Sequence, residues 1–240
     1  QQPAWVLAAD EKEADIIARS FQHWLQGSGI KTHRYPADDV RCFDGGSPSP
    51  DKPIARLKAL KAIRQNEGLI VSSSFGAMHK SLPIETLNEL ALSITVGQTV
   101  ERNTLKDTLF SMGYQGADDV DEVGILRWRG DTLTIWPPHR EHPCRVIFFD
   151  DEIESLHIIE NKGPTPLIDL EISPVREAVV TKKALVRLSR TLSDRVQRHG
   201  GNIQTRRRVL SELSGGLWFP GAEDYLPALW PLESPLNDSI

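Results

Sequence analysis

The chain has 240 residues, of which 39% are hydrophobic and 25% charged, an ordinary composition for a globular protein with room for one large domain or two small ones. Its formal net charge is −5, from 28 Lys and Arg against 33 Asp and Glu, so it lacks the overall basic excess of a dedicated nucleic-acid binder. No apolar run reaches the roughly 20 residues that a membrane-spanning helix needs.

The first part of the chain alternates between strand-like and helical patterns. Residues 4–8 (AWVLA) predict a buried strand, and Asp10 with Glu13 matches the capping box that opens a helix. Apolar residues then recur at helical spacing until Gly27. Further predicted elements are a strand over 31–35, a helix over 53–63 and a strand over 69–71. This alternation indicates a sheet that is covered by helices.

The pattern changes near Val96. Residues 100–112 predict one helix, and Gly130 with Asp131 predicts a hairpin turn. Strand-like runs without a helix between them cover 123–129, 132–136, 144–149 and 155–159, and residues 166–171 are expected to add a fifth. This block therefore predicts a small α+β domain with an antiparallel sheet and one helix.

Helical periodicity returns towards the C-terminus. Residues 181–198 and 204–213 predict two helices, and a tail rich in Pro, Gly, Trp and Leu follows from Gly215. We therefore expect an α/β domain formed by residues 1–96 and 176–240, with the α+β domain over 97–175 inserted between its two parts.

No motif for nucleotide or hydrolase chemistry is present in this sequence. It contains no GxxxxGK[ST] loop, whose backbone amides and lysine hold phosphates, and no GxGxxG, GxSxG or HExxH. We expect no catalytic residues, no cofactor and no enzymatic activity.

Two clusters of polar side chains could hold a metal in principle. His139, His142 and Cys144 have ligand chemistry but no evident fourth ligand. The acids at 150–152 are consecutive, and residues in an extended chain point alternately to opposite faces. We therefore expect a polar loop, a solvated turn and no metal, although an enzyme with an unrecognised site around His139, His142, Cys144 and Asp150 remains an alternative.

Three further features have simple explanations. Cys42 has no base to activate it as a nucleophile, and two widely spaced cysteines without a signal peptide indicate reduced thiols in a cytoplasmic protein. The Arg129–Gly130–Asp131 tripeptide is explained by a hairpin. The arginines at 206–208 fan out around a predicted helix, which favours a solvated face over a phosphate site.

Residues 97–175 carry several short motifs in a fixed order. They are a Gly-Gln start at 97–98, a helix ending in Gly-Tyr at 113–114, an Arg-Gly hairpin at 129–130 and the run PCRVIFFDDEIESL at 143–156. This set resembles the UvrA-binding domain shared by the excinuclease protein UvrB and the transcription-repair coupling factor. The flanking segments SPSPDKPIARLKAL, GLIVSSSFGAMHKSLP and GAEDYLPALWP resemble the same proteins.

The missing phosphate loop and the segment ISPVRE make the N-terminal part of the coupling factor the better match. The resemblance implies a degenerate, P-loop-ATPase-like first domain and UvrA as a direct partner. It also implies that RNA polymerase and DNA are engaged through other domains of the full-length protein, and we expect a monomer. The alternative is a fragment of the excinuclease protein UvrB that handles damaged DNA together with UvrA.

The resemblance places the UvrA contacts at Arg129, Arg145 and Phe149. Alternation along 144–149 puts Arg145 and Phe149 on one face of the strand and an apolar set on the other. The alternative is that both arginines pair with the acids at 150–152 and that Phe149 is core. Thr134 departs from the family, which commonly has Asp there. Expected core residues are Leu105, Leu109, Ile135, Val146 and Phe148.

Overall fold

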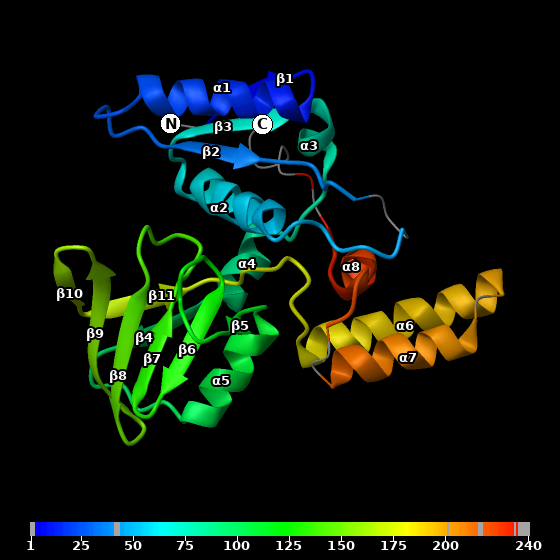
Figure 1. The fold of residues 1–240 in the computed structure, drawn as a ribbon. Coiled ribbons are helices and arrows are strands. Elements are labelled where there is room, and N and C mark those ends of the chain that lie inside the picture. The colour runs from blue at the N-terminus through cyan, green and yellow to red at the C-terminus, as the bar shows by residue number, and fades with distance from the viewer. Residues whose placement is uncertain (1–2, 41–43, 201, 216–217, 233, 235–240) are drawn as a thin grey trace. The chain divides into compact units, whose positions relative to one another are not determined.

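The computed structural model describes residues 3–40, 44–200, 202–215, 218–232 and 234 (Figure 1). It has a mixed α/β architecture that divides into two compact units. Unit 1 contains residues 1–84 and 180–240, and unit 2 contains residues 85–179. No helix in the described ranges is both long enough and apolar enough to span a membrane. The likeness of the first domain to a phosphate-loop ATPase stays a prediction.

The N-terminal part of unit 1 contains a parallel sheet with the strand order β1-β3-β2. Its strands are β1 (Ala4–Ala8), β2 (Thr32–Tyr35) and β3 (Leu69–Ser73), and its helices are α1 (Glu11–Trp24), α2 (Asp51–Gln65) and α3 (Ser74–Met78). The central strand β3 is buried along its whole length, as expected for a short apolar run inside a parallel sheet. The strands predicted over 4–8, 31–35 and 69–71 and the first two helices are confirmed.

The predicted cap at the start of α1 is confirmed for Asp10, whereas the return bond of Glu13 reaches Ala9, one residue before the N-cap. The Glu13 amide donates to the Asp10 carboxylate at 2.8 Å, and the Ala9 amide donates to the Glu13 carboxylate at 2.7 Å. Ala14 and Ala18 are buried and pack in one cluster with Val71. The reciprocal cap therefore fixes where the helix starts, and small residues let it approach the sheet closely.

The C-terminal part of unit 1 is helical. It contains α6 (Lys182–His199), α7 (Ile203–Ser214), the 3-10 helix η1 (Ala222–Tyr225) and α8 (Leu226–Leu229). Thr181 caps α6 by accepting a hydrogen bond from the Ala184 amide at 3.1 Å, and Gly200 ends it in the left-handed region at φ 68°. Both predicted helices are confirmed, whereas the two short helices after Gly215 had no sequence assignment.

Unit 2 contains a six-stranded sheet with the order β10-β9-β8-β7-β6-β5, in which only the β5–β6 pair is parallel. The strands are β5 (Gln115–Gly116), β6 (Ile125–Arg129), β7 (Thr132–Ile135), β8 (Cys144–Phe149), β9 (Glu152–Glu160) and β10 (Gly163–Leu167), and the helix α5 spans Arg102–Ser111. The predicted helix over 100–112 and the four strand-like runs are confirmed as elements. The expected core residues Leu105, Leu109, Ile135, Val146 and Phe148 are at most 2% exposed, which confirms them as core.

The prediction of one fifth strand over 166–171 is wrong. That segment is divided between β10, which pairs with β9, and β11 (Asp169–Ile172), which pairs antiparallel with β4 (Leu92–Thr95). Ile168 lies between the two strands and is 81% exposed, so the chain changes partner there. Neither β4 nor the preceding helix α4 (Ile84–Leu90) was foreseen.

The β4–β11 pair should decide whether unit 2 can fold alone. Ile94, Leu170 and Ile172 are completely buried. A fragment of residues 85–179 should unfold in one cooperative transition. A shorter fragment of residues 97–168 removes all three side chains and should lose about 5 kcal/mol of unfolding free energy, because each buried aliphatic side chain contributes about 1.5–3 kcal/mol. Urea denaturation followed by circular dichroism measures both, and equal midpoints would contradict the role given to this pair.

Candidate functional site

The strand β8 separates two kinds of side chain onto its two faces. Burial alternates without a break along the strand, with Cys144, Val146 and Phe148 buried. Arg145, Ile147 and Phe149 therefore share the other face, which the core does not cover. Phe148 also stacks on Trp128 of β6, with ring centroids 5.4 Å apart. The inner face thus fixes which residues point outward.

Cross-strand register extends this outer face to β6 and β7. Arg129 of β6 lies opposite Thr132 of β7, which in turn lies opposite Ile147 of β8. Because neighbouring strands are roughly 5 Å apart, Arg129 lies roughly 10 Å from Ile147. Arg145 and Phe149 are each two residues from Ile147 along β8. The structure therefore brings the three predicted site residues onto one face of one sheet.

The alternative interpretation, in which Phe149 belongs to the core and both arginines are paired with acids, disagrees with the structure. Phe149 is 71% exposed, and Arg129 is exposed as well. Within the described ranges, neither Arg129 nor Arg145 forms an ion pair or a side-chain hydrogen bond. The outer face therefore presents two cations without a neutralising partner and one large aromatic ring.

Two tight turns place Arg129 and Phe149 where strands end. Gly130 has φ 56° in the β6–β7 turn, and Asp150 has φ 52° in the β8–β9 turn. A left-handed backbone is easy for glycine and tolerated by aspartate. Each turn follows directly on its site residue, so Arg129 and Phe149 occupy the last positions of their strands.

Arg102 connects these two turns. Its guanidinium donates to the Asp131 carboxylate at 2.6 Å and lies 3.8 Å from the Asp151 carboxylate. The Glu101 side chain caps α5 by accepting hydrogen bonds from the amides of Asn103 and Thr104, which holds Arg102 in the first turn of the helix. Sequence reasoning missed Arg102 because its two partners are 29 and 49 residues away, and no local pattern marks such a contact.

Arg127 of β6 and Thr134 of β7 lie in line with Arg145 of β8 across the sheet. Thr134 lies between Arg127 and Arg145 in the register and is only 7% exposed. Arg127 donates to the Asp118 carbonyl at 2.9 Å and pairs with Asp119 at 3.3 Å. Thr134 carries no charge, so Arg145 has no acid opposite it on β7.

The polar cluster around Cys144 has little reactivity. Cys144 belongs to the buried face of β8, and its thiol donates weakly to the His142 carbonyl at 4.0 Å. Burial raises the pKa of this thiol to about 11, so the thiolate is scarce at neutral pH. In the described part of the chain, no three His, Cys, Asp or Glu side chains are grouped closely enough to hold a metal ion. Cys42 lies outside the described residues.

The acids at the β8–β9 turn do not form a shared site. The Asp151 carboxylate is near Arg102, and its carbonyl accepts from the Val100 amide at 2.7 Å. Glu152 is paired with Phe149 at the start of β9, and Asp150 occupies the left-handed turn position. The three acids therefore have separate contacts, which join the β8–β9 turn to the first turn of α5.

Carboxylates also occupy the edge of the parallel sheet in unit 1. Only Ala9 and Asp10 separate β1 from α1, and the Asp10 and Glu13 side chains bind the free amides there. Glu11 binds Arg34 at 2.9 Å and also accepts from the Ser73 hydroxyl. In α/β sheets this edge usually receives ligands, but here carboxylates lie at the helix N-terminus that a phosphate would need and bind the amides of Ala9 and Glu13.

Comparison with known proteins shows similarity to two kinds of DNA repair protein. The UvrB interaction domain family matches residues 92–175. The transcription-repair-coupling factor of Myxococcus xanthus is 32% identical over 95% of this chain and 20% of its own length. UvrABC system protein B of Kosmotoga olearia is 30% identical over 77% of this chain and 30% of its own length, and the transcription-repair-coupling factor of Bacillus subtilis is 26% identical over 74% and 15%. The chain thus spans less than a third of each of these relatives.

The environment of Cys144 predicts slow alkylation and alkaline instability. With a pKa of about 11, roughly one thiol in a thousand is ionised at pH 8, so iodoacetamide should modify Cys144 at least 100-fold faster in unfolded chain. Burial raises the pKa of Tyr114 as well. Since both folded pKa values are raised, their contribution to stability is complete below the ordinary thiol pKa of about 8.5 and is lost as the pH rises towards 11. Peptide mass spectrometry and urea midpoints test this, and equal alkylation rates would contradict it.

Proposed function

Because residues 92–175 belong to the UvrB interaction domain family and most of the chain is related to transcription-repair-coupling factor, we propose that it is a non-catalytic protein-interaction module of a transcription-coupled DNA repair factor. Its direct partner is UvrA, which it recruits to RNA polymerase stalled at DNA lesions. RNA polymerase is contacted by other parts of the full-length protein. The observation that carries this proposal is the exposed face with Arg129, Arg145 and Phe149.

The chemistry of that face suits a protein partner. A phenylalanine that is 71% exposed leaves a large apolar surface in water, and covering it stabilises a complex. Unpaired arginines beside it can form bidentate contacts with carboxylates of a partner. Aromatic and arginine side chains together are the residues that most often dominate interface energy. The rigid sheet also lowers the entropy lost on binding.

The absence of catalysis is proposed from the chemistry of unit 1. A bound nucleotide needs free amides and a lysine around its phosphates. At the β1–α1 turn, the Asp10 and Glu13 carboxylates take the amides and would repel a phosphate. The protonated thiol of Cys144 gives no nucleophile in unit 2. Both observations support a binding module over an enzyme.

A fragment of the excinuclease protein UvrB remains the second candidate, because UvrABC system protein B shares the same region. The coupling factor of Myxococcus xanthus matches 95% of this chain, whereas the Kosmotoga olearia protein matches 77%. The wider match favours the coupling factor. A phosphate-binding loop in the full gene just upstream of Gln1 would instead favour the excinuclease protein.

Single substitutions on the outer face should separate UvrA binding from folding. Arg129→Ala, Arg145→Ala and Phe149→Ala should each weaken the affinity for UvrA about 30-fold or more, as expected for interface hot spots of about 2 kcal/mol. Calorimetric titration of purified UvrA measures this. Matched controls are Phe75→Ala, whose side chain is 72% exposed in unit 1, and Arg190→Ala on α6.

The controls should bind UvrA like the parent chain, and all variants should keep the parent unfolding midpoint. Arg129 and Phe149 are exposed, and the half-buried Arg145 forms no ion pair with any described residue, so these side chains contribute little to stability. Unchanged UvrA affinity in all three site variants, with the fold intact, would place the contact elsewhere.

Arg102 should act on this binding as a positioning residue. Arg102→Ala removes the ion pairs to Asp131 and Asp151 and should weaken UvrA binding about two- to fivefold, the equivalent of one exposed ion pair. Arg102→Lys keeps the charge and should restore most of the affinity. If Arg102 served folding alone, Arg102→Ala would lower the unfolding midpoint and leave the UvrA affinity of the folded chain unchanged. An affinity equal to that of the parent chain in Arg102→Ala would refute the positioning role.

A further inference from the structure

The charge of the chain is distributed very unevenly. Residues 181–214, which contain α6 and α7, hold nine Lys and Arg against two Asp and Glu. The remaining residues hold 19 Lys and Arg against 31 Asp and Glu. The net charge of −5 therefore conceals a strongly basic helical segment, here called the α6–α7 hairpin.

Helical spacing arranges part of this charge in a line. Lys183, Arg187, Arg190 and Arg198 are separated by four, three and eight residues, so they follow one side of α6, and all four are exposed. This set, here called the basic stripe, extends about 22 Å along the helix at 1.5 Å per residue. It includes one acid, Asp194. The opposite side of α6 holds the buried Ala184 and Leu188.

The cations of the α6–α7 hairpin are not neutralised within the protein. Among the described residues, none of its nine Lys and Arg side chains forms an ion pair. Arg208 lies over the Phe219 ring at 5.7 Å, which leaves its charge uncompensated. Like charges along one helix repel each other, so an anionic partner that covers them relieves this repulsion.

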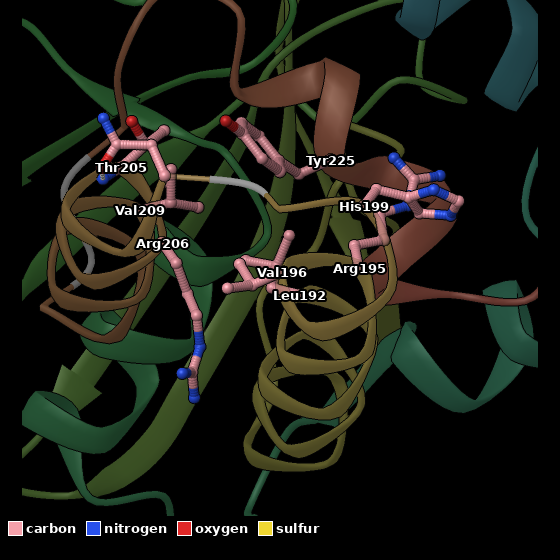
Figure 2. A pocket seen from close by; sticks show the side chains of 9 residues that line it. Leu192, Arg195, Val196, His199, Thr205, Arg206, Val209 and Tyr225 are labelled. Atoms are coloured by element: carbon pink, nitrogen blue, oxygen red, sulfur yellow. Dashed lines mark hydrogen bonds between the residues drawn. The ribbon is translucent and has the colours of Figure 1, made fainter.

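A cavity between α6 and α7 adds a second observation. It has a volume of about 530 Å³, and its walls include Arg195, His199 and Arg206 but no acid. Figure 2 shows Leu192, Val196 and Val209 directed into the space between the two helices, with Arg206 beside them. The Nε atom of Arg206 is buried and has no hydrogen-bond partner in the described part of the chain. An anionic oxygen at this position would supply the missing acceptor.

We propose that the α6–α7 hairpin binds the phosphodiester backbone of a nucleic acid without reading its sequence. The basic stripe follows a line of phosphates, and the cavity with Arg206 receives one of them. For the half-buried Arg206, this proposal replaces the solvated face that the sequence favoured at 206–208. Seven of the nine cations are arginines, whose planar guanidinium matches two phosphate oxygens at once. This site is separate from the outer face of unit 2 and goes beyond the proposed UvrA interaction.

A nucleic acid fits this surface better than an acidic protein does. A protein interface of comparable length usually has aromatic or aliphatic side chains at its centre. The basic stripe has none, and charge is its dominant feature. Duplex DNA offers one negative charge per about 1.7 Å of axis, so a 22 Å line of cations meets phosphates along its whole length.

Fluorescence anisotropy of a labelled 24-base-pair duplex, titrated with the full 240-residue chain, tests the proposal. Binding should be measurable at 50 mM salt and should weaken roughly 100-fold at 200 mM, as expected for about four neutralised phosphates. A duplex of scrambled sequence should bind within about twofold, because backbone contacts carry no sequence information.

One quadruple variant, the stripe variant, neutralises the basic stripe with the substitutions Lys183→Gln, Arg187→Gln, Arg190→Gln and Arg198→Gln. Its affinity for the duplex should fall at least tenfold, and most of the salt dependence should disappear. The matched control replaces four exposed lysines elsewhere, with the substitutions Lys12→Gln, Lys80→Gln, Lys106→Gln and Lys162→Gln, and thus removes the same total charge. The control should stay within about threefold of the parent chain, and Arg206→Gln alone should weaken binding severalfold. All variants should bind UvrA like the parent.

Three results would overturn the proposal. One is an absence of binding at 50 mM salt, and another is an equal loss in the stripe variant and the lysine control. The third is displacement of the duplex by polyglutamate as effectively as by unlabelled DNA, because the surface would then recognise acidic polypeptides. Circular dichroism melting of each variant confirms that lost binding reflects lost charge and not lost structure.

Discussion

The burial of Cys144, Val146 and Phe148 sets the register of β8, and the outer face of unit 2 depends on it. In a strand with period two, a slip by one residue would bury Arg145 and expose Val146. Burying an unpaired arginine costs several kcal/mol, while the buried apolar set would lose its transfer free energy as well. The stack of Trp128 on Phe148 fixes the same register from the neighbouring side. The packing of the inner face therefore keeps the Phe149 side chain exposed to solvent.

The parts of the fold that could be predicted from the sequence are those with local causes. The capping box of Asp10 and Glu13 and the alternation along β8 both follow from neighbours within a few residues. The division of 166–171 between β10 and β11 could not be predicted, because partner choice depends on strands far along the chain. The contacts of Arg102 could not be predicted either, because its partners Asp131 and Asp151 are also far along the chain. The positive charge of the α6–α7 hairpin, in contrast, could have been found from the sequence by counting charges within residues 181–214. The net charge of the whole chain conceals it.

Polar contacts fill one edge of the parallel sheet in unit 1. The edge of the parallel sheet, where such folds commonly bind ligands, is occupied by Glu11 with its partners Arg34 and Ser73. These contacts contribute to the packing of α1, β2 and β3, and they place carboxylates at the edge where a phosphate would bind. A fold of this kind supports many functions, so the site chemistry has to be considered on its own. Here the carboxylates at this edge hold α1 against the sheet.

The same side chain has two different roles in this chain because its neighbours differ. Arg129 and Arg145 lie on a rigid sheet beside an exposed phenylalanine, so charge there can direct a contact whose affinity comes from covering apolar surface. Arg187 and Arg190 lie on a helix without an aromatic neighbour in the stripe, so attraction between charges has to supply most of the affinity. Interactions of the first kind tolerate salt because the buried part is shielded from counterions, whereas those of the second kind weaken steeply as salt increases. Ionic strength is therefore the variable that separates the two surfaces, independently of which partner occupies each.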